Sequence, residues 1–271
     1  MKSNNLIENI RQWLSKQGLH LEMKVAKKFS DNNFEVRPSS MYEDPITNIG
    51  REIDIISSKG ILLNKNIIFD ITFVIECKYS KDKPWVLFKS SRQDYYGKNY
   101  NFMFRNSSEH AKIILLELEN FDNELKENFL FSFNDNLYYG AKRAHLNQDH
   151  MINEAINQVC NATHARSLKI DSYNNTHISN LEIQFPIIVV DGKLFESYLN
   201  NKLEIILNEI NYGHLLISRP ELGNQKFFID IVSFNYLDEY INSISNATEE
   251  ILNYSDKLET TKEFIINKNR T

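Results

Sequence analysis

The chain of 271 residues has only two cysteines, Cys77 and Cys160, and neither has a partner at the spacing of a metal-binding motif. This excludes a disulfide framework and a cysteine-based zinc site. Long apolar runs are also missing, since no segment approaches the roughly 18 apolar residues of a membrane span. Glu8 interrupts the first apolar residues before they could form the core of a signal peptide. We therefore expect a soluble, cytoplasmic protein with free thiols and no membrane contact.

Positive charge is scarce, because 31 lysines and arginines stand against 36 acidic residues and the net charge is -5. A protein that coats nucleic acid needs clustered basic residues, so this balance argues against such a role for the chain as a whole. One segment departs from the average, since the only acidic residues between positions 78 and 105 are Asp82 and Asp94. Its basic residues are Lys78, Lys81, Lys83, Lys89, Arg92, Lys98 and Arg105. This segment is the candidate for a local contact with phosphate.

Apolar content of 42% and charged content of 25% are those of an ordinary globular protein. Without internal repeats or a low-complexity linker, the sequence favours one enlarged α/β domain over residues 1–271, with two smaller domains as the alternative. Periodicity and turn residues predict helices over residues 6–14, 19–29, 85–96, 149–167 and 237–258, strands over 34–36, 53–56, 71–78, 185–190 and 227–234, a strand or helix over 111–118 and a surface excursion over 120–139. Pro38 is expected to limit the first strand.

Asp54 and Glu76 stand on two consecutive predicted strands, and Lys78 follows Glu76 at a spacing of two. Alternation along a strand puts Glu76 and Lys78 on one face, and Asp54 lies beside them if the strands pair. Two converging carboxylates suit Mg²⁺ or Mn²⁺, and a lysine beside them can act on an attacking water or on the charge that develops on phosphate. The alternative is a structural ion pair between Glu76 and Lys78, with Asp54 as an ordinary edge or turn residue.

The order helix, strand with Asp54, strand with Glu76 and Lys78, then helix resembles that of the PD-(D/E)xK, or restriction-endonuclease-like, nuclease superfamily. Residues 50–56 (GREIDII) and 74–78 (VIECK) are similar to the versions found in Mrr-like bacterial members, although Ile53 replaces the proline of the motif. The resemblance covers residues 19–98. It implies an αβββαβ catalytic core over about 19–118, with residues 149–271 as a C-terminal α/β extension. It also implies a metal site of Asp54, Glu76, the backbone carbonyl of Cys77 and Glu22 on the first core helix.

Basic and aromatic residues after the predicted catalytic strand are candidates for nucleic-acid contact. These candidates are Lys83, Trp85, Lys89, Arg92, Gln93 and Lys98. Trp85 has two interpretations, because it can stack on a substrate or fill the core at the start of a helix. Asp44 is expected to form a turn or, alternatively, to assist the site, and Glu52 is expected to be structural.

These features lead to the prediction of a magnesium-dependent endonuclease that hydrolyses phosphodiester bonds, with DNA favoured as substrate. A restriction or phage-defence role follows from the resemblance alone. Two alternatives stay open: an enzyme that cleaves RNA, and a catalytically silent nuclease fold that serves as a binding or assembly module. The sequence is compatible with a homodimer and with a partner protein from a defence system.

Overall fold

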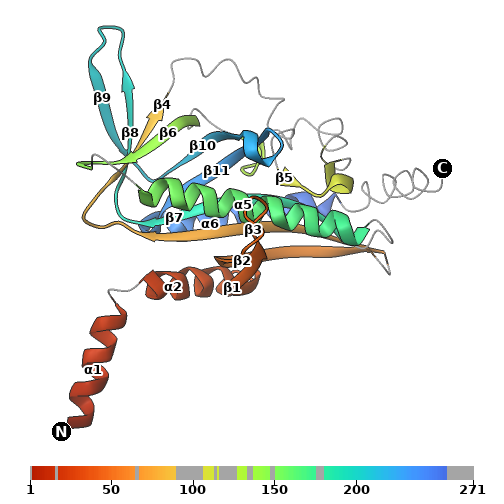
Figure 1. Ribbon diagram of the computed structural model, residues 1–271, viewed down its shortest axis with the longest axis horizontal. Coiled ribbons are helices and arrows are strands. Elements are labelled where there is room, and N and C mark those ends of the chain that lie inside the picture. Colours follow the sequence, from red (N-terminus) through yellow and green to blue (C-terminus); the bar gives the residue numbers. More distant parts are fainter. Residues whose placement is uncertain are drawn as a thin grey trace.

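The computed structural model describes residues 2–15, 18–64, 67–89, 106–112, 115, 127–132, 137–146, 150–174 and 180–254. They form a mixed α/β fold around one large sheet (Figure 1). The N-terminal part contains α1 (Lys2–Leu14), α2 (Gly18–Asp31), β1 (Glu35–Glu43), β2 (Gly50–Asn64) and β3 (Ile67–Tyr79). The middle part contains β4 (Trp85–Lys89), β5 (Asn106–Ser107), β6 (Leu137–Arg143) and α5 (His150–Asn174). The C-terminal part contains β7 (Asn180–Asp191), β8 (Leu194–Leu199), β9 (Ile205–Ile210), β10 (Tyr212–Arg219), β11 (Gln225–Ser233) and α6 (Leu237–Asn253), with short 3-10 helices at Pro220–Leu222 and Phe234–Tyr236.

The sheet runs in the order β1-β2-β3-β7-β11-β10-β6-β4-β8-β9, and β5 pairs with β7 off this path. β1, β2 and β3 form an antiparallel meander, and β7 adds to β3 in parallel. A parallel neighbour needs a crossover connection, and α5 lies on the chain between β3 and β7. The elements α2, β1, β2, β3, α5 and β7 therefore follow one another in the order αβββαβ, with further elements inserted between β3 and α5.

Helices cover both faces of this sheet, as the alternation of β3 requires. Phe73 and Ile75 belong to a core that includes α2 and α6, whereas Val74 belongs to a second core with α5. Figure 1 shows α5 running along the sheet on the opposite side from α6. Because β3 is central and faces apolar material on both sides, an ionised side chain on it is placed in an environment that disfavours charge.

Several predicted elements are confirmed, and some expectations about the first half are wrong. Pro38 does not end β1, because β1 is an edge strand and a proline there leaves no central hydrogen bond unmade. β2 extends beyond the predicted strand 53–56 and includes Gly60, which pairs with Asp70. A Cβ at Gly60 would come within 1.9 Å of Asp70 Oδ1, so the glycine permits a close strand contact.

The prediction of a helix over residues 85–96 is also wrong for residues 85–89, which the structure describes. Trp85–Lys89 is a strand that pairs with β6 and β8, and residues 90–96 lie outside the described residues. For residues 111–118, where the sequence allowed a strand or a helix, the described positions 111, 112 and 115 are helical. Part of the predicted surface excursion is internal, since Leu130 and Phe131 are buried. Short buried strands and aromatic core residues carry no clear period, which explains these errors.

Helix α1 stands away from the sheet in Figure 1, and its apolar residues Leu6 and Trp13 are exposed. Among the residues that the structure describes, no helix combines the length and apolarity needed to cross a membrane. Both cysteines are free, as expected, and both are buried.

Candidate active site

Glu76 and Lys78 lie near the end of β3, on the face that α5 covers. The Lys78 ammonium group forms an ion pair with Glu76 Oε1 and donates a hydrogen bond of 3.2 Å to Oε1 of Gln158 in α5. The Glu76 side chain is 1% exposed and that of Lys78 is 17% exposed. The spacing of two thus brings both groups to one face, as the sequence predicted.

Asp54 lies close to Glu76 and Lys78 because the pairing of β2 with β3 ends just before it. Their pairing ends at Ile55 opposite Ile75, which leaves Asp54 one residue beyond the ladder. Its Oδ2 accepts a hydrogen bond of 2.7 Å from the backbone N–H of Cys77. The Asp54 carboxylate therefore accepts the hydrogen bond that a backbone carbonyl of a paired strand would otherwise accept. This contact holds Asp54 beside the end of β3 that carries Glu76.

Glu22 reaches the site from helix α2. Leu21, Val25 and Phe29 are buried and hold that helix against the sheet. Glu22 stands beside this apolar stripe and is partly exposed. Its carboxylate raises the pKa of Glu76, and Asp54 in turn raises the pKa of Glu22, which places all three acids within electrostatic reach of one another.

Burial and mutual repulsion disfavour the ionised forms of these acids. Burial is the main cause that raises the pKa of Glu76 from 4.5 to about 7, and the charge of Asp54 adds to it. Burial likewise raises the pKa of Glu22 from 4.5 to about 7, with further contributions from Asp54 and Glu52. The pKa of Asp54 is also raised by burial, although the Cys77 N–H and Lys78 oppose the shift. One lysine does not neutralise three carboxylates.

The second oxygen of Glu76, Oε2, is buried and has no hydrogen-bond partner among the described residues. A buried carboxylate oxygen without a donor is costly, so such a group in a native protein calls for an explanation. A cation held between Glu76 and Asp54 supplies one. The structural ion pair with Lys78 satisfies only the other oxygen, Oε1.

The available donors fit a hard divalent cation, which prefers oxygen ligands. Asp54, Glu76 and Glu22 offer carboxylates, and the Cys77 carbonyl faces the same side of β3 as its N–H, toward Asp54. In the parts of the chain that the structure describes, no group of three or more His, Cys, Asp or Glu side chains already has the arrangement of a metal centre. The residues fit the cation by chemistry, and the side chains of Glu22 and Glu76 would have to adjust around it.

The residues predicted to contact nucleic acid differ in their exposure and partners. Trp85 is fully buried in the core with α5, which bears out the core interpretation and leaves no ring face for stacking. Lys89 lies 3.7 Å from Glu196 in an ion pair. Lys83 is partly exposed. The other three candidates, Arg92, Gln93 and Lys98, lie outside the described residues.

Two residues near the site were missed or interpreted differently from sequence. Gln158 contacts Lys78 across 80 residues of chain, and no local pattern around it points to that contact. Glu52 was expected to be structural, yet its charge raises the pKa of both Glu22 and Asp54. The spacing of two between Glu52 and Asp54 is the signal that could have indicated this.

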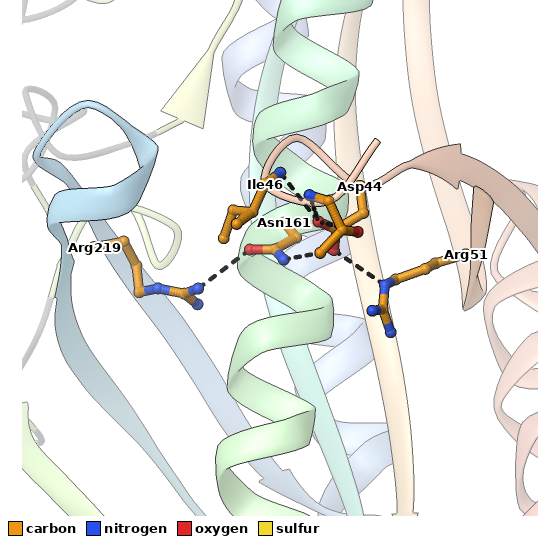
Figure 2. Close-up of polar contacts among 6 residues, drawn as sticks. Asp44, Ile46, Arg51, Asn161 and Arg219 are labelled. Carbon is orange, nitrogen blue, oxygen red and sulfur yellow. Dashed lines mark hydrogen bonds and ion pairs between the residues drawn. The ribbon is translucent and has the colours of Figure 1, made fainter. Parts of the chain in front are cut away.

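A second polar group ties α5 to the loop between β1 and β2 (Figure 2). Asp44 Oδ1 accepts hydrogen bonds from the backbone N–H groups of Ile46 and Thr47, which confirms its turn-forming role. Its Oδ2 accepts a bond of 2.8 Å from Asn161 and lies 3.2 Å from the guanidinium of Arg51. Burial alone would raise the pKa of Asp44, but these hydrogen bonds outweigh burial and lower it.

Asn161 also accepts a hydrogen bond of 3.3 Å from Arg219, at the end of β10. Asn161 stands three residues after Gln158, so both project from neighbouring positions on one side of α5. The same helix therefore contacts Lys78 through one side chain and anchors the β1–β2 loop through the other.

Comparison of the chain with protein-family models, with curated proteins and with solved structures found no match.

Proposed function

We propose that this protein is a divalent-metal-dependent nuclease that hydrolyses phosphodiester bonds, with a restriction-endonuclease-like core. The observation that carries the proposal is the buried, unpartnered oxygen of Glu76 beside Asp54, in a group where three carboxylates accompany one lysine. A structural ion pair needs one carboxylate for one lysine. The excess of carboxyl groups over lysine is explained if a cation completes the site.

The order of elements supports the same proposal. The helix with Glu22, the meander with Asp54, Glu76 and Lys78, and the parallel strand after α5 follow the αβββαβ order that the resemblance to the PD-(D/E)xK superfamily implies. The added strands after β7 extend the same sheet, so the C-terminal half is an elaboration of this core.

Each side chain has a task in such a reaction. A bound Mg²⁺ or Mn²⁺ would polarise the phosphate and lower the pKa of a coordinated water. Asp54 and Glu76 would hold the ion, with Glu22 and the Cys77 carbonyl around it. Lys78, which the hydrogen bond to Gln158 orients, would stabilise negative charge on the phosphate or position the attacking water. DNA is the favoured substrate, and RNA is the alternative because the same chemistry acts on both.

A cleavage assay tests this proposal on labelled duplex DNA, single-stranded DNA and RNA in Mg²⁺, Mn²⁺, Ca²⁺ or excess chelator. We expect turnover with Mg²⁺ or Mn²⁺ and none with Ca²⁺ or chelator. Asp54→Asn should lower turnover by at least about a hundredfold and weaken metal binding, since a neutral amide is a poorer ligand for a hard cation.

Asp70→Asn is the matched control for this variant. Asp70 lies on the same face of β3 as Glu76, but toward the opposite end of the strand. It is a partly buried aspartate whose pKa is also raised. The Asp70→Asn variant should cleave the substrate as fast as the parent protein does. Undiminished cleavage in chelator, or equal losses in both variants, would overturn the metal-dependent mechanism. No cleavage of any substrate by a protein that binds Mg²⁺ would favour the silent binding module.

A further inference from the structure

A surface cavity of about 830 Å³ lies between β1 and α5. Its apolar wall includes Met41, Ile56, Ala162 and Leu168, and its polar lining includes Tyr42. Met41 and Leu168 are 67% and 51% exposed, so the cavity opens to solvent. Binding sites for small organic ligands are mainly apolar, with a few polar groups, and measure roughly 300–1,000 Å³. The cavity thus has the size of a ligand site, and polar and apolar residues share its lining.

The backbone connects this cavity directly to the carboxylates. Ile53 lines the cavity and immediately precedes Asp54, and it pairs across the sheet with Ser40, which also lines the cavity. Tyr42 follows Ser40 by two residues on β1. The charge of Glu76 contributes to the raised pKa of Tyr42, so the two side chains are within electrostatic reach of each other. A ligand bound in the cavity would therefore lie beside the proposed scissile phosphate.

Basic residues outnumber acidic residues in the cavity lining. Arg37, Arg166 and Lys169 line the cavity against a single acid, Glu43. Arg37 is paired with Glu35 and Arg166 with buried Glu182, whereas Lys169 is exposed and has no ion pair within the described residues. Lys169 therefore supplies an available ammonium group, at the α5 side of the cavity.

One buried polar atom in the cavity lining also lacks a partner. The hydroxyl oxygen of Tyr42 is inaccessible to solvent and makes no hydrogen bond to any described residue. Since this oxygen is closed off from the cavity, the ring of Tyr42 is the part of the side chain that a ligand in the cavity would meet. The apolar wall suits the flat face of a nucleobase.

We propose that this cavity binds an unpaired nucleotide of the substrate strand, next to the phosphate that is cleaved. The base contacts the apolar wall and Tyr42, and Lys169 faces the phosphate of the same strand. A paired base is held inside a duplex, so the nucleotide must come from a single strand. The proposal rests on the nuclease function and adds a preference for unpaired substrate.

The test is fluorescence anisotropy of a labelled single-stranded oligonucleotide, and of its blunt duplex, in Ca²⁺ to prevent turnover. Ala165→Trp fills the cavity and Lys169→Glu reverses its available charge. Both variants should bind the single strand about tenfold more weakly, since Ala165→Trp removes the space for the base and Lys169→Glu removes the ammonium group that faces the phosphate. Duplex binding should change little. Lys202→Glu, at an exposed lysine of the β8–β9 hairpin, is the matched control and should bind both as the parent does.

Thermal melts of all three variants exclude loss of folding as the cause. Unchanged single-strand binding by folded Lys169→Glu and Ala165→Trp would overturn the proposal, and so would equal losses on single strand and duplex. Failure of the nuclease function is distinguishable, because it appears as absent or Asp54-independent cleavage while the anisotropy result still reports on the cavity. If Asp54 is required for cleavage and the cavity variants bind and cleave normally, only the nucleotide site is wrong.

Discussion

At the scale of single residues, the central feature is a carboxylate in a place that disfavours its charge. Glu76 lies on a central strand, is 1% exposed and shares its surroundings with Asp54. The lysine two residues away contacts only one of its oxygens. Natural proteins seldom keep such a group unless its charge is used, so function accounts for it better than stability does.

The raised pKa values make stability depend on pH in a definite direction. The pKa of Glu76 and that of Glu22 are raised from 4.5 to about 7, so folding takes up protons. Their contribution to stability is fully present below the ordinary carboxylate pKa and is lost as pH rises through about 7. A cation replaces those protons, because carboxylate ligands must be ionised to bind metal.

We therefore expect Mg²⁺ to raise the melting temperature very little at about pH 5 and clearly at about pH 8. Differential scanning fluorimetry across this range, with and without Mg²⁺, measures the effect. Glu76→Gln should reduce both the pH dependence and the response to Mg²⁺. A Mg²⁺ effect of equal size at both pH values would mean that the ion binds elsewhere on the surface.

The residues of this site could be predicted from the sequence because the chemistry is local. Glu76 and Lys78 share a strand face by alternation alone, and Asp54 needs only the pairing of two adjacent strands. Gln158 could not be predicted, since its contact with Lys78 depends on how α5 packs across the sheet. Trp85 was ambiguous because a buried and a substrate-facing tryptophan look alike in sequence.

At the scale of elements, helix α5 links the site to the loop between β1 and β2. Gln158 contacts Lys78, and Asn161 holds Asp44, which in turn shapes the loop (Figure 2). The same loop supplies Pro45 and Asn48 to the cavity. A change in the Asn161 contact should therefore affect both stability and substrate binding.

We expect Asn161→Ala to destabilise the protein by about 1–3 kcal/mol, because it leaves the buried Asp44 carboxylate with a lost donor and Arg219 with a lost acceptor. KM for cleavage should rise more than kcat falls, since the loop borders the cavity and not the carboxylates. Denaturant unfolding and steady-state kinetics measure these effects.

Asn157→Ala is the control on the same helix, where the asparagine is exposed. It should change stability by less than about 0.5 kcal/mol. Equal effects of the two substitutions would show that helix propensity, rather than the contact with Asp44, is responsible.

The elements that the sequence predicted well are those with a strong period or a continuous β-branched run. Helices α2 and α6 and strands β3 and β7 are of this kind. β4, β8 and β9 were missed or interpreted as helix, because each is short and gains its stability from neighbours far along the chain. Tertiary pairing of that kind leaves little trace in local sequence.

At the scale of the whole molecule, one sheet joins the two halves of the chain. β7 and β11 from the C-terminal half continue the meander of the N-terminal half, so the carboxylates of β2 and β3 lie on a sheet with cores on both faces. A rigid sheet keeps like charges together that would separate in a flexible loop. The net charge of -5 adds to the repulsion, which a bound cation would reduce.

The central claim is that these carboxylates bind a divalent cation and do not serve only as a structural ion pair. Thermal melting of Lys78→Ala with and without Mg²⁺ tests it most directly. If the group binds metal, the variant has one more unneutralised carboxylate and should gain at least as much melting temperature from Mg²⁺ as the parent does. If Lys78 only neutralises Glu76, its loss leaves a buried charge unpaired and costs roughly 3–5 kcal/mol. A variant that melts far below the parent and does not respond to Mg²⁺ would contradict the metal site.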